Sequence, residues 1–261
     1  MVRALGVIPA RFASTRFPGK PLASFGDKTL IEQVVARVRA ASRLERVIVA
    51  TDDRRIADVC RSSGVEVRLT STDHPSGTDR VAEVARDAAP PYDVVVNVQG
   101  DEPFVTPTSL DGLVGALEDD ETIEIATLSE PVERIEELFD RNVVKVVTDL
   151  AGRALYFSRS PIPYFAGEPS AADLRSALRS RRGGLTGYLK HQGIYAYRTS
   201  ALLAMTAMPP SPLERDEALE QLRALQAGLR IRVLRSDFRS VGVDTPADLE
   251  RAVALLGESH A

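Results

Sequence analysis

The stretch VIPARFASTRFPGK, residues 7–20, joins an apolar run to a loop that is rich in cations and small side chains. The apolar run is typical of a buried strand. Arg11, Arg16 and Lys20 follow it, with Ser14 among the small residues between them. In open α/β sheets, ligands bind outside the carboxyl ends of the strands, where backbone N–H groups and nearby cations can hold an anion. We therefore predict that this loop binds a polyphosphate and is not merely a solvated basic turn.

Two familiar nucleotide-binding loops do not fit this stretch. The pattern G-x-x-x-x-G-K-[ST] fails because Ser14 stands at its first glycine and Pro21 follows Lys20. The G-x-G-x-x-G fingerprint of dinucleotide-binding sheets is absent, which excludes a dehydrogenase of that type.

Strand-like and helix-like patterns alternate through the first hundred residues. Strands are expected at residues 4–10, 46–51, 65–70 and 93–100, and helices at 29–41, 54–64 and 78–88. Residues 94–96 are three valines without polar alternation, as expected for a strand that is covered on both faces. This order predicts an α/β fold in which helices cover both sides of a parallel sheet.

After about residue 120 the strand-like runs come closer together. They fall at residues 123–132, 143–150, 153–160 and 193–198. We expect a mixed sheet with an added lobe. Residues 164–186 are polar and glycine-rich and are interpreted as a long mobile excursion.

Two capped helices are predicted towards the end of the chain. One covers residues 211–225, with Ser211 as N-cap and Glu214 closing a capping box. The other follows Thr245, which has Asp248 three residues further on.

The composition limits the class of protein. The 261 residues carry a net charge of −4, and duplex- or membrane-binding surfaces usually need a basic excess, so we expect neither partner. The single cysteine, Cys60, lies in a helical pattern, where we expect it to be buried and inert, and it fits a reducing compartment. No apolar run approaches the roughly 20 residues that span a bilayer, and the first residues already resemble a core strand rather than a signal peptide. We expect a cytoplasmic protein.

A second polar cluster, QGDE at residues 99–102, follows the valine-rich strand. Gly100 lets the backbone turn close to a ligand. A carboxylate that faces the polyphosphate loop is suited to Mg²⁺, which binds few protein carboxylates together with phosphate oxygens. The alternative is an acidic turn before a helix. Of the two acids we choose Asp101, because Pro103 restricts Glu102 to extended conformations.

Two further segments allow both a ligand role and a structural one. Asp244 precedes the last helix and is a candidate second metal ligand, although an acid at that position often serves the helix dipole. In SGTDR, residues 76–80, Ser76 or Thr78 can cap the next helix, and a capped N-terminus can also accept an anion or a base edge.

Polar residues beside the later strand runs suggest an acceptor pocket. They are Arg159, His191, Tyr195, Glu217 and Gln221. The last two are four residues apart and are expected on one face of the helix at 211–225. A lone histidine or arginine is more often structural, so each role stays open at this point.

Eight motifs in this order resemble the 3-deoxy-manno-octulosonate cytidylyltransferase (CMP-Kdo synthetase) family. They are IPARFASTRFPGKPL, VATDD, SGTDR, VNVQGDEP, ALYFSRSPIPY, KHQGIYAYR, LEQLR and GVDTP, and they are distributed over nearly the whole chain. The resemblance implies a Rossmann-like, glycosyltransferase-A-like nucleotidyltransferase fold: a mixed sheet flanked by helices, with a smaller sugar-binding and dimerisation lobe. It implies a homodimer that converts CTP and Kdo to CMP-Kdo and pyrophosphate with Mg²⁺, for lipopolysaccharide biosynthesis.

The resemblance also assigns parts of the chain. Residues 1–261 form a single nucleotidyltransferase domain. Residues 1–120 mainly bind CTP, residues 121–240 mainly bind the sugar and the partner subunit, and residues 241–261 supply a metal ligand and a helix.

Carried over by position, the resemblance gives three sets of site residues. The catalytic residues are Arg16, Lys20, Asp101 and Asp244, of which the two acids are the metal ligands. The nucleotide-binding residues are Pro9, Ala10, Arg11, Ser14, Lys20, Ser76, Arg80 and Gln99. The sugar-binding residues are Gln99, Arg159, His191, Tyr195, Glu217 and Gln221.

One position departs from the family pattern. The family often has an arginine a few residues after the IPY segment, where it can meet the sugar carboxylate, and here Ala166 stands at that place. Either an arginine of the following excursion (Arg175, Arg179, Arg181 or Arg182) supplies the charge, or the acceptor is a relative of Kdo. The alternative acceptors are 8-amino-Kdo and a sialic acid. An alternative of another class is a silent regulator that binds CTP but releases no pyrophosphate.

Overall fold

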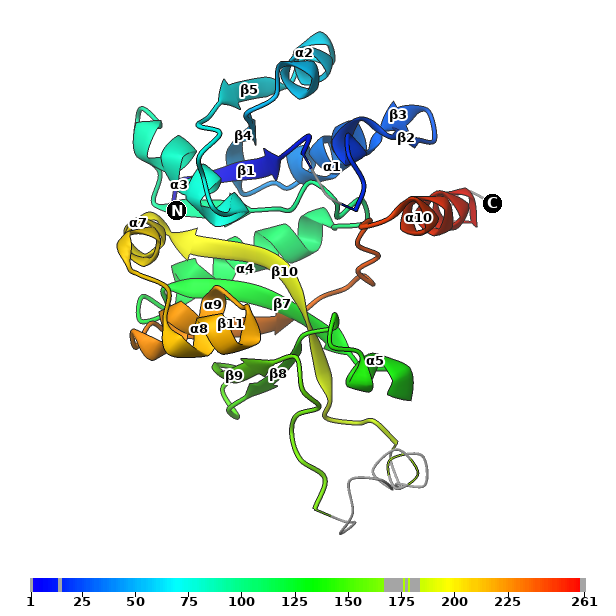
Figure 1. Cartoon of the computed structure of the whole chain (residues 1–261). Coiled ribbons are helices and arrows are strands. Elements are labelled where there is room, and N and C mark those ends of the chain that lie inside the picture. Colours follow the sequence, from blue (N-terminus) through cyan, green and yellow to red (C-terminus); the bar gives the residue numbers. More distant parts are fainter. Residues whose placement is uncertain (1, 14–15, 167–175, 177, 179–183, 259–261) are drawn as a thin grey trace.

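A nine-stranded mixed sheet runs through the molecule and has helices on both faces (Figure 1). The structure is a computed structural model that describes residues 2–13, 16–166, 176, 178 and 184–258. Seven strands lie in the order β11-β7-β10-β6-β1-β4-β5, while β8 pairs with β10 and β9 with β8. The strands are β1 (Ala4–Ala10), β4 (Leu44–Thr51), β5 (Glu66–Leu69), β6 (Val94–Asn97), β7 (Ile125–Pro131), β8 (Lys145–Thr148), β9 (Ala154–Ser158), β10 (Leu189–Arg198) and β11 (Ile231–Arg235). The predicted mixed α/β architecture is confirmed.

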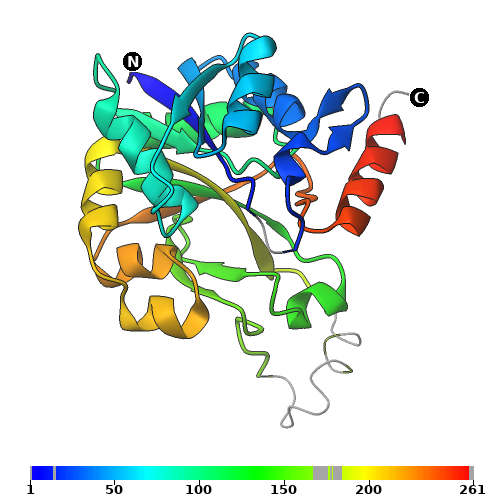
Figure 2. The ribbon, with the colours of Figure 1, turned by 45° about the horizontal axis from the view of Figure 1, so that its top comes forward.

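The helices alternate with the strands in the first part of the chain, and later three of them, α7, α8 and α9, follow one another between β10 and β11. They are α1 (Leu30–Arg39), α2 (Arg54–Ser62), α3 (Gly77–Asp87), α4 (Pro107–Asp119), α5 (Ile135–Phe139), α7 (Thr199–Ala207), α8 (Pro212–Glu217), α9 (Gln221–Gln226) and α10 (Pro246–Glu258). A 3₁₀ turn, η1 (Lys20–Leu22), and a small hairpin of β2 (Ser24–Phe25) and β3 (Lys28–Thr29) connect β1 to α1. The turned view shows α10 beside this hairpin, far from the β8–β9 hairpin (Figure 2).

Strand β1 shows why the sheet is covered on both sides. All of its residues are buried. Ala4 and Ile8 belong to the core cluster that contains the apolar faces of α1 and α4. Leu5 and Val7 belong to the cluster that contains those of α3, α7 and α9. Because successive strand residues point to opposite faces, an uninterrupted apolar run requires helices on both, and each buried aliphatic side chain stabilises the fold by about 1.5–3 kcal/mol.

The direction of the strands decides where a site can form. β1 is parallel to β4 and to β6, with Ala4 opposite Val94. β10 runs antiparallel to β6 and places Tyr195 opposite Asn97, at the last residue of β6. The loops that follow β1 and β6 therefore leave the sheet at the same edge, and β10 enters it there.

The predicted helix over residues 211–225 is wrong in one respect, because the structure divides it into α8 and α9. Ala218 lies between them with a left-handed φ of 51°. The carbonyls of Glu217 and Ala218 accept hydrogen bonds from the Arg159 guanidinium at 2.7 and 3.2 Å, so partners outside the helix replace the intrahelical ones. The expectation that Glu217 and Gln221 share one helix face is therefore also wrong.

Both predicted capping boxes are confirmed. Ser211 accepts from the backbone of Glu214, whose carboxylate in turn accepts from the backbone of Ser211. Thr245 and Asp248 make the same reciprocal pair at the start of α10. Cys60 is buried on α2 as expected, and burial raises the pKa of its thiol to about 11.

Parts of two predictions lie outside the described residues. The first is the nucleotide-binding role of Ser14. The second is the predicted excursion, of which residues 167–175, 177 and 179–183 are not described. Within the described part of the chain, no helix has the length and apolar character needed to cross a membrane.

Candidate functional site

The loops after β1 and β6 meet at the common edge of the sheet. The backbone N–H of Val98 donates to the carbonyl of Val7 at 3.1 Å, which continues the β1–β6 pairing towards that edge. A Cβ atom built on Gly100 would lie 3.1 Å from the backbone oxygen of Pro9, so the two loops approach as closely as glycine allows. The polyphosphate loop and the QGDE cluster are thus neighbours in space.

Lys20 connects the two predicted metal ligands. Its ammonium lies 2.6 Å from Asp101 Oδ2 and 3.4 Å from Asp244 Oδ1. Arg16 Nη2 lies 3.1 Å from the same oxygen of Asp244. The preceding Gly19 has a φ of 72°, a conformation that favours glycine, and it delivers Lys20 to this position at the start of η1.

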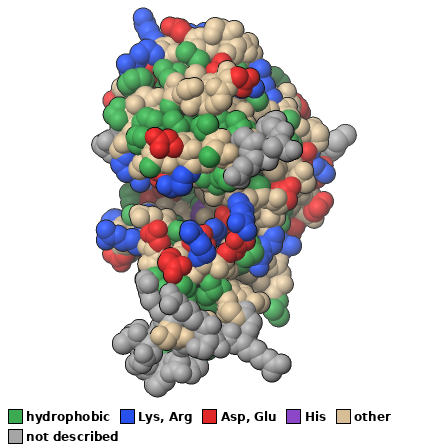
Figure 3. All heavy atoms as spheres, turned by 90° about the vertical axis from the view of Figure 1, so that its right-hand side faces the viewer, with side chains coloured by type: hydrophobic (Ala, Val, Ile, Leu, Met, Phe, Trp, Pro, Cys, Tyr) green, Lys and Arg blue, Asp and Glu red, His purple; other side chains and the backbone are tan. Residues whose placement is uncertain are grey.

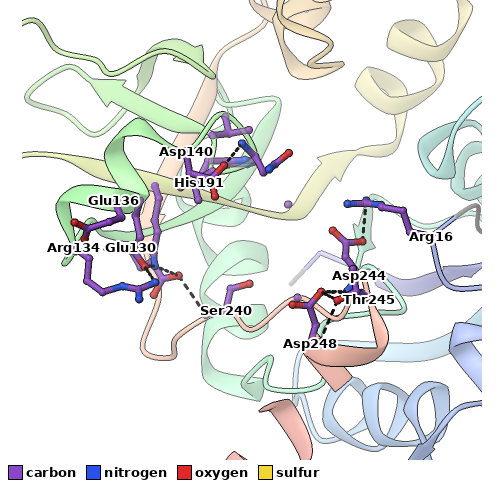
Figure 4. A pocket seen from close by; sticks show the side chains of 17 residues that line it. Arg16, Glu130, Arg134, Glu136, Asp140, His191, Ser240, Asp244, Thr245 and Asp248 are labelled. Carbon is purple, nitrogen blue, oxygen red and sulfur yellow. Dashed lines mark hydrogen bonds and ion pairs between the residues drawn. The ribbon is translucent and has the colours of Figure 1, made fainter. Parts of the chain in front are cut away.

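Asp244 reaches the site from the far end of the chain. The backbone N–H of Val243 donates to the carbonyl of Asp101 at 3.1 Å, and the N–H of Asp244 donates to Asp248 at 3.1 Å. Figure 4 shows Asp244 directed towards Arg16 while Thr245 and Asp248 close the start of α10. The cap is therefore made by Thr245 and Asp248, and the Asp244 carboxylate is left for the cations.

These two carboxylates suit a magnesium ion that also binds phosphate. Mg²⁺ prefers oxygen ligands and usually takes one or two carboxylates, with substrate phosphates and water completing its shell. Asp101 and Asp244 are both partly exposed, and each contacts the single nitrogen of Lys20, so one cation already lies between them. Among the described residues no three histidine, cysteine or acidic side chains group around a common point.

A cavity of about 440 Å³ opens beside this cluster. Eight residues of the predicted site line it: Pro9, Ala10, Arg11, Arg16, Lys20, Ser76, Gln99 and Asp101. Arg11 donates to the carbonyl of His74 at 2.6 Å, and its buried Nε has no hydrogen-bond partner in the described part of the chain. Ser76 caps α3 by accepting from the backbone of Asp79. Ser76 therefore caps the helix and also lines the cavity, so the structural role and the ligand-binding role that the sequence left open are compatible.

Arg80 does not line this cavity. Its side chain is fully buried, donates to Asp52 Oδ2 at 2.6 Å and contacts Thr70. The structure therefore places Arg80 beneath the start of α3, where it ties that helix to the loop after β4.

A second hollow, of about 230 Å³, brings together four of the predicted sugar-binding residues. They are Gln99, His191, Tyr195 and Gln221. His191 lies 3.0 Å from Thr127 Oγ1 and packs edge-on against Phe157, and burial lowers the pKa of its imidazole to about 3. Gln99 lines both cavities, so the two hollows are adjacent.

Arg159 and Glu217 lie next to the second hollow but do not line it. The Glu217 carboxylate accepts from the Ser158 hydroxyl at 2.6 Å and from the backbone N–H of Arg159 at 2.8 Å. The Arg159 guanidinium donates to the carbonyls of Arg141, Glu217 and Ala218. Among the described residues no carboxylate forms an ion pair with this guanidinium.

A larger hollow of about 700 Å³ connects the metal-ligand side to the α5 side. Figure 4 shows Arg16 and Asp244 on one side of it and His191 and Asp140 on the other, with Ser240 between the two sides. Charged side chains of both signs gather around a hollow on this side of the molecule (Figure 3).

Three residues near the site were not predicted from the sequence as site residues: Glu102, Ser240 and Lys190. Glu102 is buried, its carboxylate accepts from the Ser240 hydroxyl, and burial beside Asp101 raises its pKa to about 8. Lys190 lies 2.9 Å from Glu137 and 3.5 Å from Glu130. Lys190 could have been found from the sequence, because it directly precedes the predicted site residue His191. The sequence does not indicate that Ser240 donates to Glu102.

A sheet of this topology, with a basic loop after its first strand and two acids around one cation, has the parts that a nucleotidyltransferase needs. The model of the cytidylyltransferase family matches residues 5–231. The chain is 48% identical to the 3-deoxy-manno-octulosonate cytidylyltransferase of Solibacter usitatus, over 98% of this chain and 96% of that protein. It is 49% identical to the enzyme of the same name from Syntrophotalea carbinolica, over 96% and 97% of the two chains. The chain belongs to the 3-deoxy-manno-octulosonate cytidylyltransferase family, as the motifs predicted.

Solved structures agree with this assignment. A structure of CMP:2-keto-3-deoxy-manno-octonic acid synthetase complexed with CTP is 40% identical, with a TM-score of 0.86 over 98% of this chain and 99% of that chain. A cytidylyltransferase from Leptospira borgpetersenii is 17% identical with a TM-score of 0.61, covering 100% and 96% of the two chains, and shows the shared fold alone. The predicted nucleotidyltransferase fold and enzyme class are confirmed.

Proposed function

We propose that the protein transfers the cytidylyl group of CTP to 3-deoxy-D-manno-octulosonate, giving CMP-Kdo and pyrophosphate. The observation that carries the proposal is the position of Lys20 between Asp101 and Asp244, at the mouth of a cavity lined by the basic loop. The names of relatives that match nearly the whole chain, and the CTP complex of a similar structure, support both substrates.

The nucleotide would occupy the cavity of about 440 Å³. Arg11, Arg16 and Lys20 would bind the triphosphate, because fixed guanidinium and ammonium groups recognise phosphate oxygens without reorganisation. The lining residues of this cavity fall within residues 9–13, 16–21, 75–77 and 99–101, which supports the assignment of residues 1–120 to CTP.

Asp101 and Asp244 would hold Mg²⁺, and the described residues fit it as two oxygen ligands that leave room for phosphate. When bound, the ion would neutralise phosphate charge and lower the pKa of a hydroxyl that it contacts. Lys20 would then be released to the phosphates. Arg16, whose partner is Asp244, would be released in the same way.

The sugar would lie in the hollow beside His191, Tyr195 and Gln221. The imidazole of His191, with its lowered pKa, is neutral at pH 7 and offers hydrogen bonds rather than charge. Arg159, whose guanidinium meets only carbonyl oxygens in the described part of the chain, is the nearest predicted source of positive charge for an acidic sugar.

The chemistry would be an in-line displacement. The hydroxyl on the anomeric carbon of the sugar would attack the α-phosphorus and lose its proton to water. The bond from the α-phosphorus to the bridging oxygen would break, and pyrophosphate would leave with the electron pair. Such a reaction needs positioning and charge stabilisation more than covalent help. Lys20 and Arg16 would stabilise the departing pyrophosphate, and the shared position of Gln99 in both cavities would bring the two substrates together.

We also propose a homodimer that works in the cytoplasm and serves lipopolysaccharide biosynthesis. The β8–β9 hairpin exposes the apolar side chains of Leu150 and Leu155, which makes it our candidate for the subunit contact. The buried Cys60 thiol fits a reducing compartment. Sedimentation analysis would show whether the protein in solution has the mass of two chains.

An assay of pyrophosphate release tests the proposed reaction. The purified protein is given CTP, Mg²⁺ and, in separate reactions, Kdo, 8-amino-Kdo or N-acetylneuraminate. We expect Kdo to give the highest kcat/KM and UTP to replace CTP poorly. A higher kcat/KM with 8-amino-Kdo or N-acetylneuraminate would show that the acceptor is not Kdo. This comparison matters because Ala166 stands where the family often has an arginine for the sugar carboxylate. Binding of CTP without pyrophosphate release from any acceptor would refute the proposed activity.

A further inference from the structure

Glu102 is a buried acid beside the predicted metal ligand Asp101 and has no part in the reaction described above. It is 8% exposed, and the lining of the nucleotide cavity does not include it. The hydroxyl of Ser240 lies 2.8 and 2.9 Å from its two carboxylate oxygens. Because a buried polar group left without its partner is costly, this contact fixes the two side chains relative to one another.

Ser240 belongs to the segment that delivers Asp244 to the site. Its backbone N–H donates to the buried Glu130 at 3.3 Å, so the residue is held from β7 as well as from Glu102. Three residues further on, the N–H of Val243 donates to the backbone of Asp101. The segment 240–243 is thus fastened at both of its ends to the elements that surround the first metal ligand.

Such a tether is needed because the two metal ligands repel one another. Asp101 and Asp244 carry like charges and contact one ammonium group. Lys20 and Arg16 hold Asp244 in the structure, but under the proposed function both cations also bind phosphate. A hydrogen bond that is independent of these cations would keep Asp244 in place when the nucleotide enters.

We propose that Glu102 is a positioning residue for the metal site, which holds Ser240 and thereby fixes Asp244 opposite Asp101. The inference rests on the proposed function. The geometry does not make Glu102 a third ligand, because within the described residues no three such side chains surround a common point and its carboxylate is directed to Ser240.

The test measures metal binding without turnover. Mn²⁺ is titrated by electron paramagnetic resonance into the full-length protein with CTP and without sugar. We expect Ser240→Ala and Glu102→Ala to weaken Mn²⁺ binding about five- to tenfold, as loss of one buried hydrogen bond of about 1–1.5 kcal/mol predicts. Glu102→Gln keeps a carbonyl acceptor for Ser240 and should stay within about twofold of the wild type.

Ser236→Ala is the matched control. Its hydroxyl donates to the carbonyl of Phe238, inside the same connecting segment, and does not touch Glu102. We expect Mn²⁺ binding as in the wild type. In turnover assays Ser240→Ala should raise the Mg²⁺ concentration needed for half-maximal rate and leave the KM for Kdo within about twofold, which a general loss of structure would not do.

Wild-type Mn²⁺ binding in Ser240→Ala would overturn the inference. Equal weakening in Glu102→Gln and Glu102→Ala would also overturn it, because Glu102→Gln keeps an acceptor oxygen for Ser240 and Glu102→Ala does not. If the alanine variant at Glu102 does not fold, as judged by circular dichroism, Ser240→Ala and Glu102→Gln decide the question. Failure of the wild-type protein to bind Mn²⁺ with CTP would refute the proposed metal instead.

Discussion

Lys145 is a lysine that the fold buries completely, and replacing it should weaken both the fold and sugar use. Its ammonium donates to three backbone carbonyls: Asp140 at 2.9 Å, Val143 at 2.5 Å and Arg159 at 2.6 Å. The side chain is fully buried, and burial lowers the pKa of the ammonium group. One cation thus joins the turn after α5 to the end of β9, where Arg159 begins the predicted sugar-binding segment.

The expected size follows from counting acceptors. Lys145→Met keeps the length of the side chain but leaves three carbonyls without this donor, each at about 1–3 kcal/mol when no water replaces it. Methionine avoids the desolvation of an ammonium group, which offsets several kcal/mol. We expect a net loss of about 3 kcal/mol in the free energy of unfolding, a large part of the 5–15 kcal/mol typical of a domain.

Urea unfolding followed by circular dichroism measures this loss. The matched control is Lys28→Met, since Lys28 is exposed and pairs with Asp27 at 3.6 Å, a contact worth less than about 1 kcal/mol. With Kdo as substrate, Lys145→Met should also raise the KM for Kdo more than the KM for CTP, because the Arg159 backbone loses its anchor. Equal unfolding midpoints for Lys145→Met and Lys28→Met would refute the reasoning.

Three further predictions concern the site. Asp101→Asn should lower the rate of pyrophosphate release by orders of magnitude while the urea midpoint stays near the wild-type value; a near-normal rate would remove Asp101 from the metal role. Lys20→Ala should lower kcat about 10²–10³-fold and also raise the KM for CTP, since a cation on the leaving group is lost; an effect on the KM for Kdo alone would show that the loop is misassigned. His191 has a folded-state pKa of about 3, below its ordinary 6.5, so its contribution to stability is present above pH 6.5 and is lost as the pH falls towards 3. His191→Gln should therefore remove about 1.4 kcal/mol per pH unit from the pH dependence of the free energy of unfolding between pH 6 and 4, and an unchanged slope in urea titrations would contradict this.

The sequence predicted the architecture because local patterns and long-range packing agree in the first half of the chain. An apolar run such as residues 94–96 fits only a strand that is buried on both faces. In the structure these residues belong to β6 and are all buried. The helix at 211–225 failed for the opposite reason. Its capping box and apolar spacing favour a continuous helix, but hydrogen bonds from Arg159, distant in sequence, stabilise a left-handed Ala218. Periodicity carries no information about such a partner.

The candidate site was predictable where strand ends determine position. Parallel pairing of β1 and β6 places the basic loop beside Asp101 through backbone contacts alone, independently of side-chain packing. Asp244 was suggested by the helix cap that follows it, and its meeting with Lys20 depends on the path of the chain from β11 to α10. Arg80 shows the limit, because a buried pair with Asp52 and a phosphate contact call for the same residue type. Charge and motif alone do not distinguish the two roles.

The charges of the site link its two ligands under the proposed function. In the structure the acids and the cations neutralise each other: Lys20 serves both Asp101 and Asp244, and Arg16 serves Asp244. A triphosphate that entered alone would compete with the acids for these cations and leave two carboxylates unpaired. A magnesium ion that entered alone would compete with the cations for the acids. When both enter, each set of protein charges exchanges one partner for another of the same sign, so neither ligand leaves a charge unpaired. The same arrangement that holds the free site together therefore favours binding of the metal and the nucleotide as one unit.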